Sequence, residues 1–274
     1  MQENAMATPT GKLPLSVVVP VYNAETFITD AMRELTAYLA AWPEQPVELI
    51  IVDDGSTDQT SRLIKDAVAD APIHVQVLRN ARNRGKGAAI YRGMQLASGH
   101  PRVFLDADLA YPPSEIAQVC TALSAGADVV IACRVDPSSR YVISPSFFRY
   151  LYTRHVAGRI FSWLAHIVLL PGILDSQAGL KGFTAAAAEQ LFTGWLPDGF
   201  SFDLAVLFRA QQLGLKIEQM PVVYRYDTEP TTVRFLLDTL VVLRDLVRIR
   251  IRLSRKSARA RPAAQSDPSR VAGS

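Results

Sequence analysis

The sequence predicts a single α/β domain with a mostly parallel central sheet and helices on both of its faces. Short apolar runs rich in β-branched residues alternate with helical stretches along the first half of the chain. The runs are apolar throughout, which is typical of parallel strands buried on both faces. The length of 274 residues and the 49% hydrophobic content suit one large core, and they exclude a disordered chain, a collagen-like repeat and a disulfide scaffold.

The first strand is the β-branched run LSVVVPV at Leu15–Val21. A helix is expected at about 25–41, because the proline-marked loop WPEQP interrupts the pattern after it. The run VELIIV at 47–52 is the second strand, and the helix that follows at 58–69 has Ser56 or Thr57 as its candidate cap.

The third strand, at 75–78, is separated from a helix at about 87–97 by the polar loop NARNRGKG. A short fourth strand at 103–105 runs directly into two aspartates. A helix at 113–125, which begins at a proline, leads to a fifth strand at 128–132. Beyond it the alternation weakens, and we expect loops and amphipathic helices, with one late strand in MPVVYRY.

Positive charge is concentrated at the C-terminal end. Residues 231–274 hold ten Lys and Arg against three Asp, whereas residues 1–230 hold 19 basic and 23 acidic side chains. We therefore divide the chain into a disordered N-terminus (1–13), the folded domain (14–230), an amphipathic basic helix (231–253) and a disordered tail (254–274). No zinc spacing, helix-turn-helix pattern or aromatic-interleaved basic patch indicates nucleic-acid binding.

The basic helix is predicted to dock on an anionic membrane surface, since an apolar stripe runs along it at Leu236, Leu240, Leu243 and Val247 with arginines close to a second face. Two alternatives are that the stripe packs on the domain, or that the alternation VRIRIRL is a strand. The aromatic and arginine-containing segment 146–170 is either interfacial or a pair of core helices.

The chain shows no secretory signal and no run of about 18 apolar residues that would span a membrane. Its two cysteines, Cys120 and Cys133, are expected to be reduced core residues. We therefore expect a cytoplasmic protein that associates with the membrane peripherally.

Polar clusters follow four of the predicted strands, and the carboxyl ends of parallel strands are where ligands bind. The sharpest cluster is Asp106-Ala107-Asp108, whose two carboxylates suit a hard divalent cation and phosphate oxygens better than a solvated turn. Asp53 and Asp54 fit either a strand end with a helix cap or a reader of a nucleobase. The glycine-rich loop around Lys86 resembles a phosphate cradle, with an exposed basic turn as the alternative.

In order along the chain, the strings VVVPVYNAE, IIVDDGSTD, NRGKGAAI, VFLDADLAYPP, VVIACR, DSQAGLKGF and GFSFDLAVL resemble family 2 glycosyltransferases of the GT-A fold. Within that family the chain is most similar to the dolichyl- or polyprenyl-phosphate sugar synthases, because DSQAGLKGF matches the β-glucosyltransferase branch. It departs from the family pattern at Ala24, Ala110 and Ala205 and at Ala132-Cys133.

The resemblance implies a role for each matched residue. Catalytic roles are implied for Asp108, Arg134, Asp175 and Asp203, and metal binding, to Mg²⁺ or Mn²⁺, for Asp106 and Asp108. The nucleotide is expected at Pro20, Val21, Tyr22, Asn23, Glu25, Asp53, Asp54, Lys86, Asp106 and Ala107. The acceptor and sugar end is expected at Arg134, Gln177 and Lys181, with Arg140, Arg149 or Arg154 as a second arginine.

The implied activity is inverting transfer of a hexose, with UDP-glucose as the expected donor, to a polyprenyl or dolichyl phosphate. Mannosyl transfer from GDP-mannose and a transferase with a non-lipid acceptor are the alternatives. A nucleotide-sugar sensor without activity and a nucleotidyltransferase fit the residues less well, the latter because no glycine- and arginine-rich loop follows the first strand.

Overall fold

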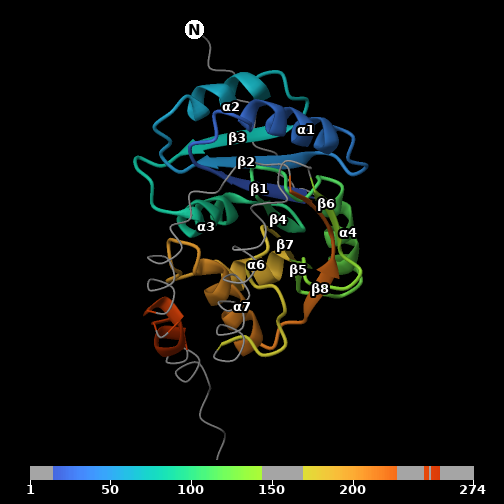
Figure 1. Ribbon diagram of the computed structural model, residues 1–274, viewed down its shortest axis with the longest axis vertical. Helices are drawn as coiled ribbons and strands as arrows, with labels where there is room; N and C mark the ends of the chain where they lie inside the picture. Colours follow the sequence, from blue (N-terminus) through green and yellow to red (C-terminus); the bar gives the residue numbers. More distant parts are fainter. Residues whose placement is uncertain (1–14, 144–168, 227–243, 247, 254–274) are drawn as a thin grey trace, which may run out of the picture.

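The structure is a computed structural model that describes residues 15–143, 169–226, 244–246 and 248–253 (Figure 1). The predicted disordered ends, most of segment 146–170 and the stripe at Leu236, Leu240, Leu243 and Val247 lie outside the described side chains. Arg149 and Arg154 also lie outside them.

A seven-stranded sheet forms the centre of the domain, with strand order β3-β2-β1-β4-β7-β5-β8. All its pairings are parallel except those of β7, which runs antiparallel to both neighbours. The strands are β1 (Leu15–Val21), β2 (Val47–Asp53), β3 (His74–Arg79), β4 (Arg102–Leu105), β5 (Val129–Cys133), β7 (Leu180–Phe183) and β8 (Ile217–Pro221). A second small sheet pairs β6 (Arg140–Ile143) with β9 (Val223–Tyr226) in parallel.

Helices cover both faces of the large sheet, and Figure 1 shows α1 and α2 on one side of β1–β3 and α3 on the other. The first layer is α1 (Ile28–Ala40), α2 (Thr60–Val68) and α4 (Glu115–Ser124), and the second is α3 (Lys86–Leu96), α6 (Ala185–Leu191) and α7 (Phe202–Gln212). Alternate residues of β1 serve the two cores: Val17 and Val19 pack with the first layer and Val18 with the second. The fully buried strands therefore need apolar side chains on both faces, as the sequence pattern predicted.

The five predicted strands and four predicted helices of the first half are confirmed, with ends that differ by up to three residues. The cap prediction is wrong, because α2 begins at Thr60 after Gln59, and neither Ser56 nor Thr57 caps it. The region after Arg134 also departs from the expectation. The strand β7 lies between β4 and β5, and MPVVYRY is divided between β8 and β9.

The described part of the C-terminal helix packs against the domain. Leu246, Ile249 and Leu253 are buried in the second core. Residues 248–253 are helical, so the strand alternative for VRIRIRL is wrong. The guanidinium of Arg252 lies 4.7 Å from the centre of the Trp195 ring. This part of the helix therefore contributes its apolar face to the core, whereas the side chain of Arg248 is 52% exposed.

Candidate active site

The loops after β1 and β2 are tied to each other by side chains that the sequence assigned to the nucleotide. The Asn23 amide oxygen accepts from the Thr57 backbone N–H at 2.8 Å, and the Glu25 carboxylate accepts from that of Gln59 at 3.0 Å. Val21 is buried, whereas Tyr22 is 42% exposed and so presents its ring at this edge of the sheet. Pro20, the penultimate residue of β1, is half-buried.

Asp53 and Asp54 are both buried and both bonded within the protein. Asp53 accepts from the Ser56 N–H at 2.8 Å, from the Ser61 hydroxyl, and lies 3.5 Å from the Arg79 guanidinium. The Asp54 carboxylate accepts from the Asn80 amide at 2.6 Å and, through its other oxygen, from the backbone N–H groups of residues 84 and 85 at 3.0 and 2.6 Å. Asp54 thus fixes the start of the glycine-rich loop.

Lys86 is brought to the paired aspartates by that loop. Gly85 has a φ of 108°, which favours glycine, and a Cβ there would lie 2.7 Å from the Asp198 carbonyl oxygen. α3 begins at Lys86, whose ammonium lies 2.5 Å from Asp106 Oδ1. Burial lowers the pKa of Lys86, but the charges of Asp106 and Asp203 outweigh it and leave that pKa above its usual value.

The Asp106-Ala107-Asp108 turn leaves β4 at the same edge. Asp106 Oδ2 lies so close to Gly179 that a Cβ on Gly179 would be 1.9 Å from this oxygen. The Asp108 carboxylate accepts from the Ala110 N–H at 3.1 Å. Leu109 adopts a φ of 49°, so the chain turns sharply after the pair. Among the described residues no three His, Cys, Asp or Glu side chains gather as a complete metal site. Two carboxylates suit Mg²⁺ or Mn²⁺ that takes its other ligands from phosphate and water.

Arg134, directly after β5, is held by Asp175 through three hydrogen bonds. Its backbone N–H and Nε donate to Asp175 Oδ2 at 2.9 and 2.7 Å, and Nη2 donates to Oδ1 at 2.8 Å. Burial raises the pKa of Asp175, but the hydrogen bonds and charge of Arg134 outweigh it and hold that pKa below its usual value. The Arg134 side chain is 28% exposed, so the guanidinium is oriented from below and can still meet an anion.

Lys181 and Asp203 form an interior ion pair, with side chains 0% and 2% exposed. Lys181 Nζ lies 2.6 Å from Asp203 Oδ1 and donates to the Ala178 carbonyl at 2.6 Å. Burial lowers the pKa of Lys181 and raises that of Asp203, and each partner offsets part of the effect on the other. The structure therefore places both side chains beneath the site, where they can position other groups without facing open solvent.

Three further side chains near Asp175 and Asp108 each have a buried polar atom without a hydrogen-bond partner in the described structure: Tyr111, Ser176 and Gln177. Of these, the sequence predicted only Gln177 as a site residue. Arg140 lies on β6 and is exposed. The AYPP string after the aspartates was a signal for Tyr111, but nothing in the sequence shows that its hydroxyl is buried.

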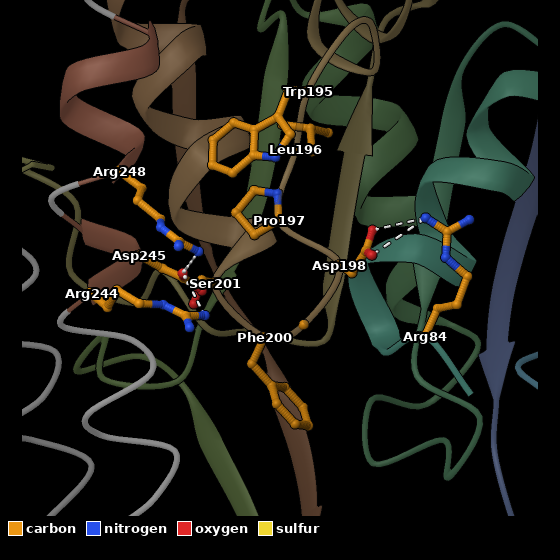
Figure 2. Close-up of a pocket in the computed structure, with 11 residues that line it drawn as sticks. Arg84, Trp195, Leu196, Pro197, Asp198, Phe200, Ser201, Arg244, Asp245 and Arg248 are labelled. Carbon is orange, nitrogen blue, oxygen red and sulfur yellow. Dashed lines mark hydrogen bonds and ion pairs between the residues drawn. The ribbon is translucent and has the colours of Figure 1, made fainter. Parts of the chain in front are cut away.

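A separate pocket of about 500 Å³ lies between Arg84, the loop 195–201 and the C-terminal helix (Figure 2). Arg84 pairs with Asp198 across it at 3.3 Å, and Arg244 pairs with Asp245 at 3.4 Å. None of its lining residues was predicted as a site residue. Its lining includes neither Asp106 nor Arg134.

The sheet order, the paired aspartates after β4 and the lysine loop together define a GT-A glycosyltransferase. The fold is similar to that of glucosyl-3-phosphoglycerate synthase from Mycobacterium tuberculosis, with a TM-score of 0.62 and 20% identity over 86% of this chain and 80% of that one. It is also similar to a mannosyltransferase from Pyrobaculum calidifontis in complex with GDP-Man and Mn²⁺, with a TM-score of 0.59 and 21% identity over 93% of this chain and 66% of that one.

Sequence comparison gives the family. The glycosyl transferase family 2 model matches residues 16–159. The chain is 33% identical to the dolichyl-phosphate beta-glucosyltransferase of Drosophila melanogaster over 77% of its own length and 66% of that protein's. It is 38% identical to the undecaprenyl-phosphate 4-deoxy-4-formamido-L-arabinose transferase of Pectobacterium atrosepticum over 44% of its length and 37% of that protein's. The chain belongs to glycosyl transferase family 2.

Proposed function

We propose that the protein transfers a hexose, glucose from UDP-glucose, to the phosphate of a polyprenyl or dolichyl lipid. The observation that carries the proposal is that two groups suited to binding anions follow β4 and β5, two parallel strands separated by β7. Asp106 and Asp108 follow β4 and are met by Lys86 from the start of α3, and Arg134, held by Asp175, follows β5. The Drosophila and Pectobacterium relatives are, by their names, sugar transferases that use dolichyl phosphate and undecaprenyl phosphate.

The donor diphosphate is assigned to the end of the site at Asp106, Asp108 and Lys86, and its base to the edge at Tyr22 and Asp53 or Asp54. A divalent ion held by the two aspartates would neutralise charge on the leaving diphosphate. The Lys86 ammonium, now on Asp106, is placed to meet a diphosphate oxygen at the N-terminus of α3, where anions are favoured.

The acceptor phosphate is assigned to Arg134, whose planar guanidinium can donate two parallel hydrogen bonds to it. An acceptor oxygen attacks the anomeric carbon as the bond from that carbon to the diphosphate oxygen breaks, and the nucleoside diphosphate leaves with the electron pair. The attacking oxygen is already ionised near neutral pH, so no side chain has to remove a proton. Attack on the face opposite the diphosphate converts an α-linked donor into a β-linked product.

A panel of radiolabelled donors tests the proposal: UDP-glucose, UDP-galactose, UDP-GlcNAc and GDP-mannose, each with a short polyprenyl phosphate or with small phosphorylated acceptors. We expect label to enter the lipid fraction from UDP-glucose, with a β-linkage seen in the anomeric coupling constant of the product. Label that enters only small acceptors, or only from GDP-mannose, would replace the lipid acceptor or the donor in the proposal. Donor binding without transfer to any acceptor would indicate a sensor.

Peripheral attachment to an anionic membrane is also part of the proposal. No helix among the described residues is long and apolar enough to cross a bilayer. The side chains of Arg244 and Arg248 are 57% and 52% exposed, and further basic residues follow in the sequence at Arg255 and Lys256. Exposed basic side chains near an anionic leaflet each contribute about 1 kcal/mol.

Removal of the helix would not test this attachment cleanly, because it would uncover the core around Leu246, Ile249 and Leu253. Replacement of Arg248 and Arg255 by Gln keeps that face. We expect weaker co-sedimentation with phosphatidylglycerol vesicles, and wild-type binding that falls as salt rises. Replacing Arg62 and Lys65 of α2 by Gln is a control with the same change in charge. Equal sedimentation of both variants would refute attachment through the C-terminal arginines.

A further inference from the structure

Tyr111 has a buried hydroxyl for which the described residues provide no hydrogen-bond partner. The residue is 1% exposed, and its hydroxyl oxygen has no hydrogen-bond partner within the described structure. Buried hydroxyls are nearly always hydrogen-bonded, because an unpaired donor in the interior has lost its water without replacement. An unpaired buried hydroxyl beside a functional site therefore indicates that a ligand, rather than the protein, supplies its acceptor.

The surroundings of Tyr111 place this hydroxyl at the Arg134 end of the site. The charges that act on it most strongly are those of Arg134 and Asp175, with Asp106 a weaker contributor. Its ring packs edge-on against Tyr224, with the ring centres 5.0 Å apart, and the Arg134 guanidinium carbon lies 5.6 Å from the centre of the Tyr224 ring. Tyr111 thus packs against the aromatic ring over which the Arg134 guanidinium lies.

We propose that Tyr111 is a second residue that binds the acceptor phosphate, and that its hydroxyl donates a hydrogen bond to the phosphate oxygen that Arg134 does not engage. This inference rests on the proposed function, since it takes the anion at Arg134 to be the acceptor phosphate. A phosphate has three terminal oxygens, and a planar guanidinium engages two of them, which leaves one for a neutral donor at its side.

The state of the hydroxyl fits a donor rather than a base. Burial raises the pKa of Tyr111 well above its usual value, more than the charge of Arg134 lowers it. The phenol therefore keeps its proton throughout the working pH range. A neutral donor adds a hydrogen bond to the phosphate without adding a positive charge next to Arg134.

The variant Tyr111→Phe tests the inference, because it removes the hydroxyl and keeps the ring against Tyr224. We expect the KM for a short polyprenyl phosphate to rise about five- to tenfold, while the Kd for UDP with Mn²⁺, measured by calorimetry, stays within twofold of wild type. We also expect Tm to stay equal or rise, since the variant loses an unpaired buried polar group. Tyr38→Phe, on α1 beside Trp42, is the control for the two binding readouts and should change neither the acceptor KM nor the UDP Kd.

The outcomes separate this inference from the proposed function. An unchanged acceptor KM in an active Tyr111→Phe enzyme would overturn the role of Tyr111 and leave lipid transfer intact. A weaker UDP affinity with an unchanged acceptor KM would move the hydroxyl to the donor and would also overturn it. A fall in Tm of several degrees would show that the hydroxyl has a structural partner. If the wild-type enzyme transfers to no polyprenyl phosphate, the proposed function itself fails.

Discussion

Breaking the Lys181–Asp203 pair should both destabilise the fold and impair the site, and a double variant separates the two effects. In Asp203→Asn the Lys181 ammonium keeps its contact with the Ala178 carbonyl but loses the only carboxylate bonded to it in the described structure. Both side chains are almost fully buried, so the remaining charge has little access to water. Removal of one partner of such a pair costs about 3–5 kcal/mol. For a domain of this size that is a fall in Tm of roughly 6–20 °C.

The double variant Lys181→Met/Asp203→Leu removes both charges, and replacing a buried pair by apolar side chains is often close to neutral. We expect calorimetry to show that most of the lost Tm returns. Activity should remain reduced, because the Asp203 charge also acts on the Lys86 ammonium, and its loss leaves Lys86 held by the aspartates after β4 alone. The double variant should therefore bind UDP more weakly than wild type while it unfolds at nearly the same temperature.

Two results would refute this reasoning. A loss below 1 kcal/mol in Asp203→Asn would mean that water reaches the pair. Wild-type kcat, KM and UDP affinity in the double variant would show that Asp203 only neutralises Lys181 and does not position Lys86. A matched control is Arg62→Gln on α2, which breaks an exposed ion pair with Asp66. We expect this substitution to change the free energy of unfolding by less than about 1 kcal/mol.

Three shorter predictions concern the reacting end of the site. Asp108→Asn should abolish transfer and weaken UDP binding in Mn²⁺, and unchanged metal-dependent affinity by calorimetry would remove the metal assignment. Arg134→Lys keeps the charge but loses the planar fork, so kcat/KM should fall about tenfold or more, equivalent to about 1.4 kcal/mol, and wild-type kinetics would contradict it. Gly179→Ala should displace Asp106 and reduce transfer at least tenfold. In the control Gly182→Ala the new Cβ meets Val119 instead, so Tm should fall while the affinity for Mn²⁺ is retained. Equal effects of the two alanines on Mn²⁺ affinity would show that Gly179 has no special relation to the carboxylate.

The first half of the fold could be predicted because each strand is a continuous apolar run that ends in polar residues. LSVVVPV and VELIIV became β1 and β2 with ends within one residue of the prediction. The carboxyl ends of parallel strands lie at the same edge of a sheet. Asp106 after β4 and Arg134 after β5 therefore lie at one edge, as expected. Local pattern and global fold agree throughout this region.

The strand β7 could not be predicted for a physical reason. Its four residues, LKGF, contain a lysine and a glycine, and neither is typical of a buried central strand. The lysine is tolerated because Asp203, 22 positions later, and the Ala178 carbonyl meet its ammonium in the interior. The glycine is needed because a Cβ at Gly182 would lie 2.2 Å from Val119. Both causes are contacts between distant parts of the chain, which the local sequence does not reveal.

The charges that meet at this edge do not balance. Carboxylates of Asp106, Asp108, Asp175 and Asp203 face the cations of Lys86, Lys181 and Arg134, so the ionised groups carry one net negative charge. Each cation already lies within about 3 Å of a carboxylate oxygen, at 2.5, 2.6 and 2.7 Å. A nucleoside diphosphate and an acceptor phosphate that entered together would add several negative charges to a site with no uncommitted cation among these seven groups. If the two substrates bind as proposed, Coulomb repulsion between them should make a divalent cation at Asp106 and Asp108 necessary for binding both, and we expect omission of Mn²⁺ to weaken their joint binding as well as to slow transfer.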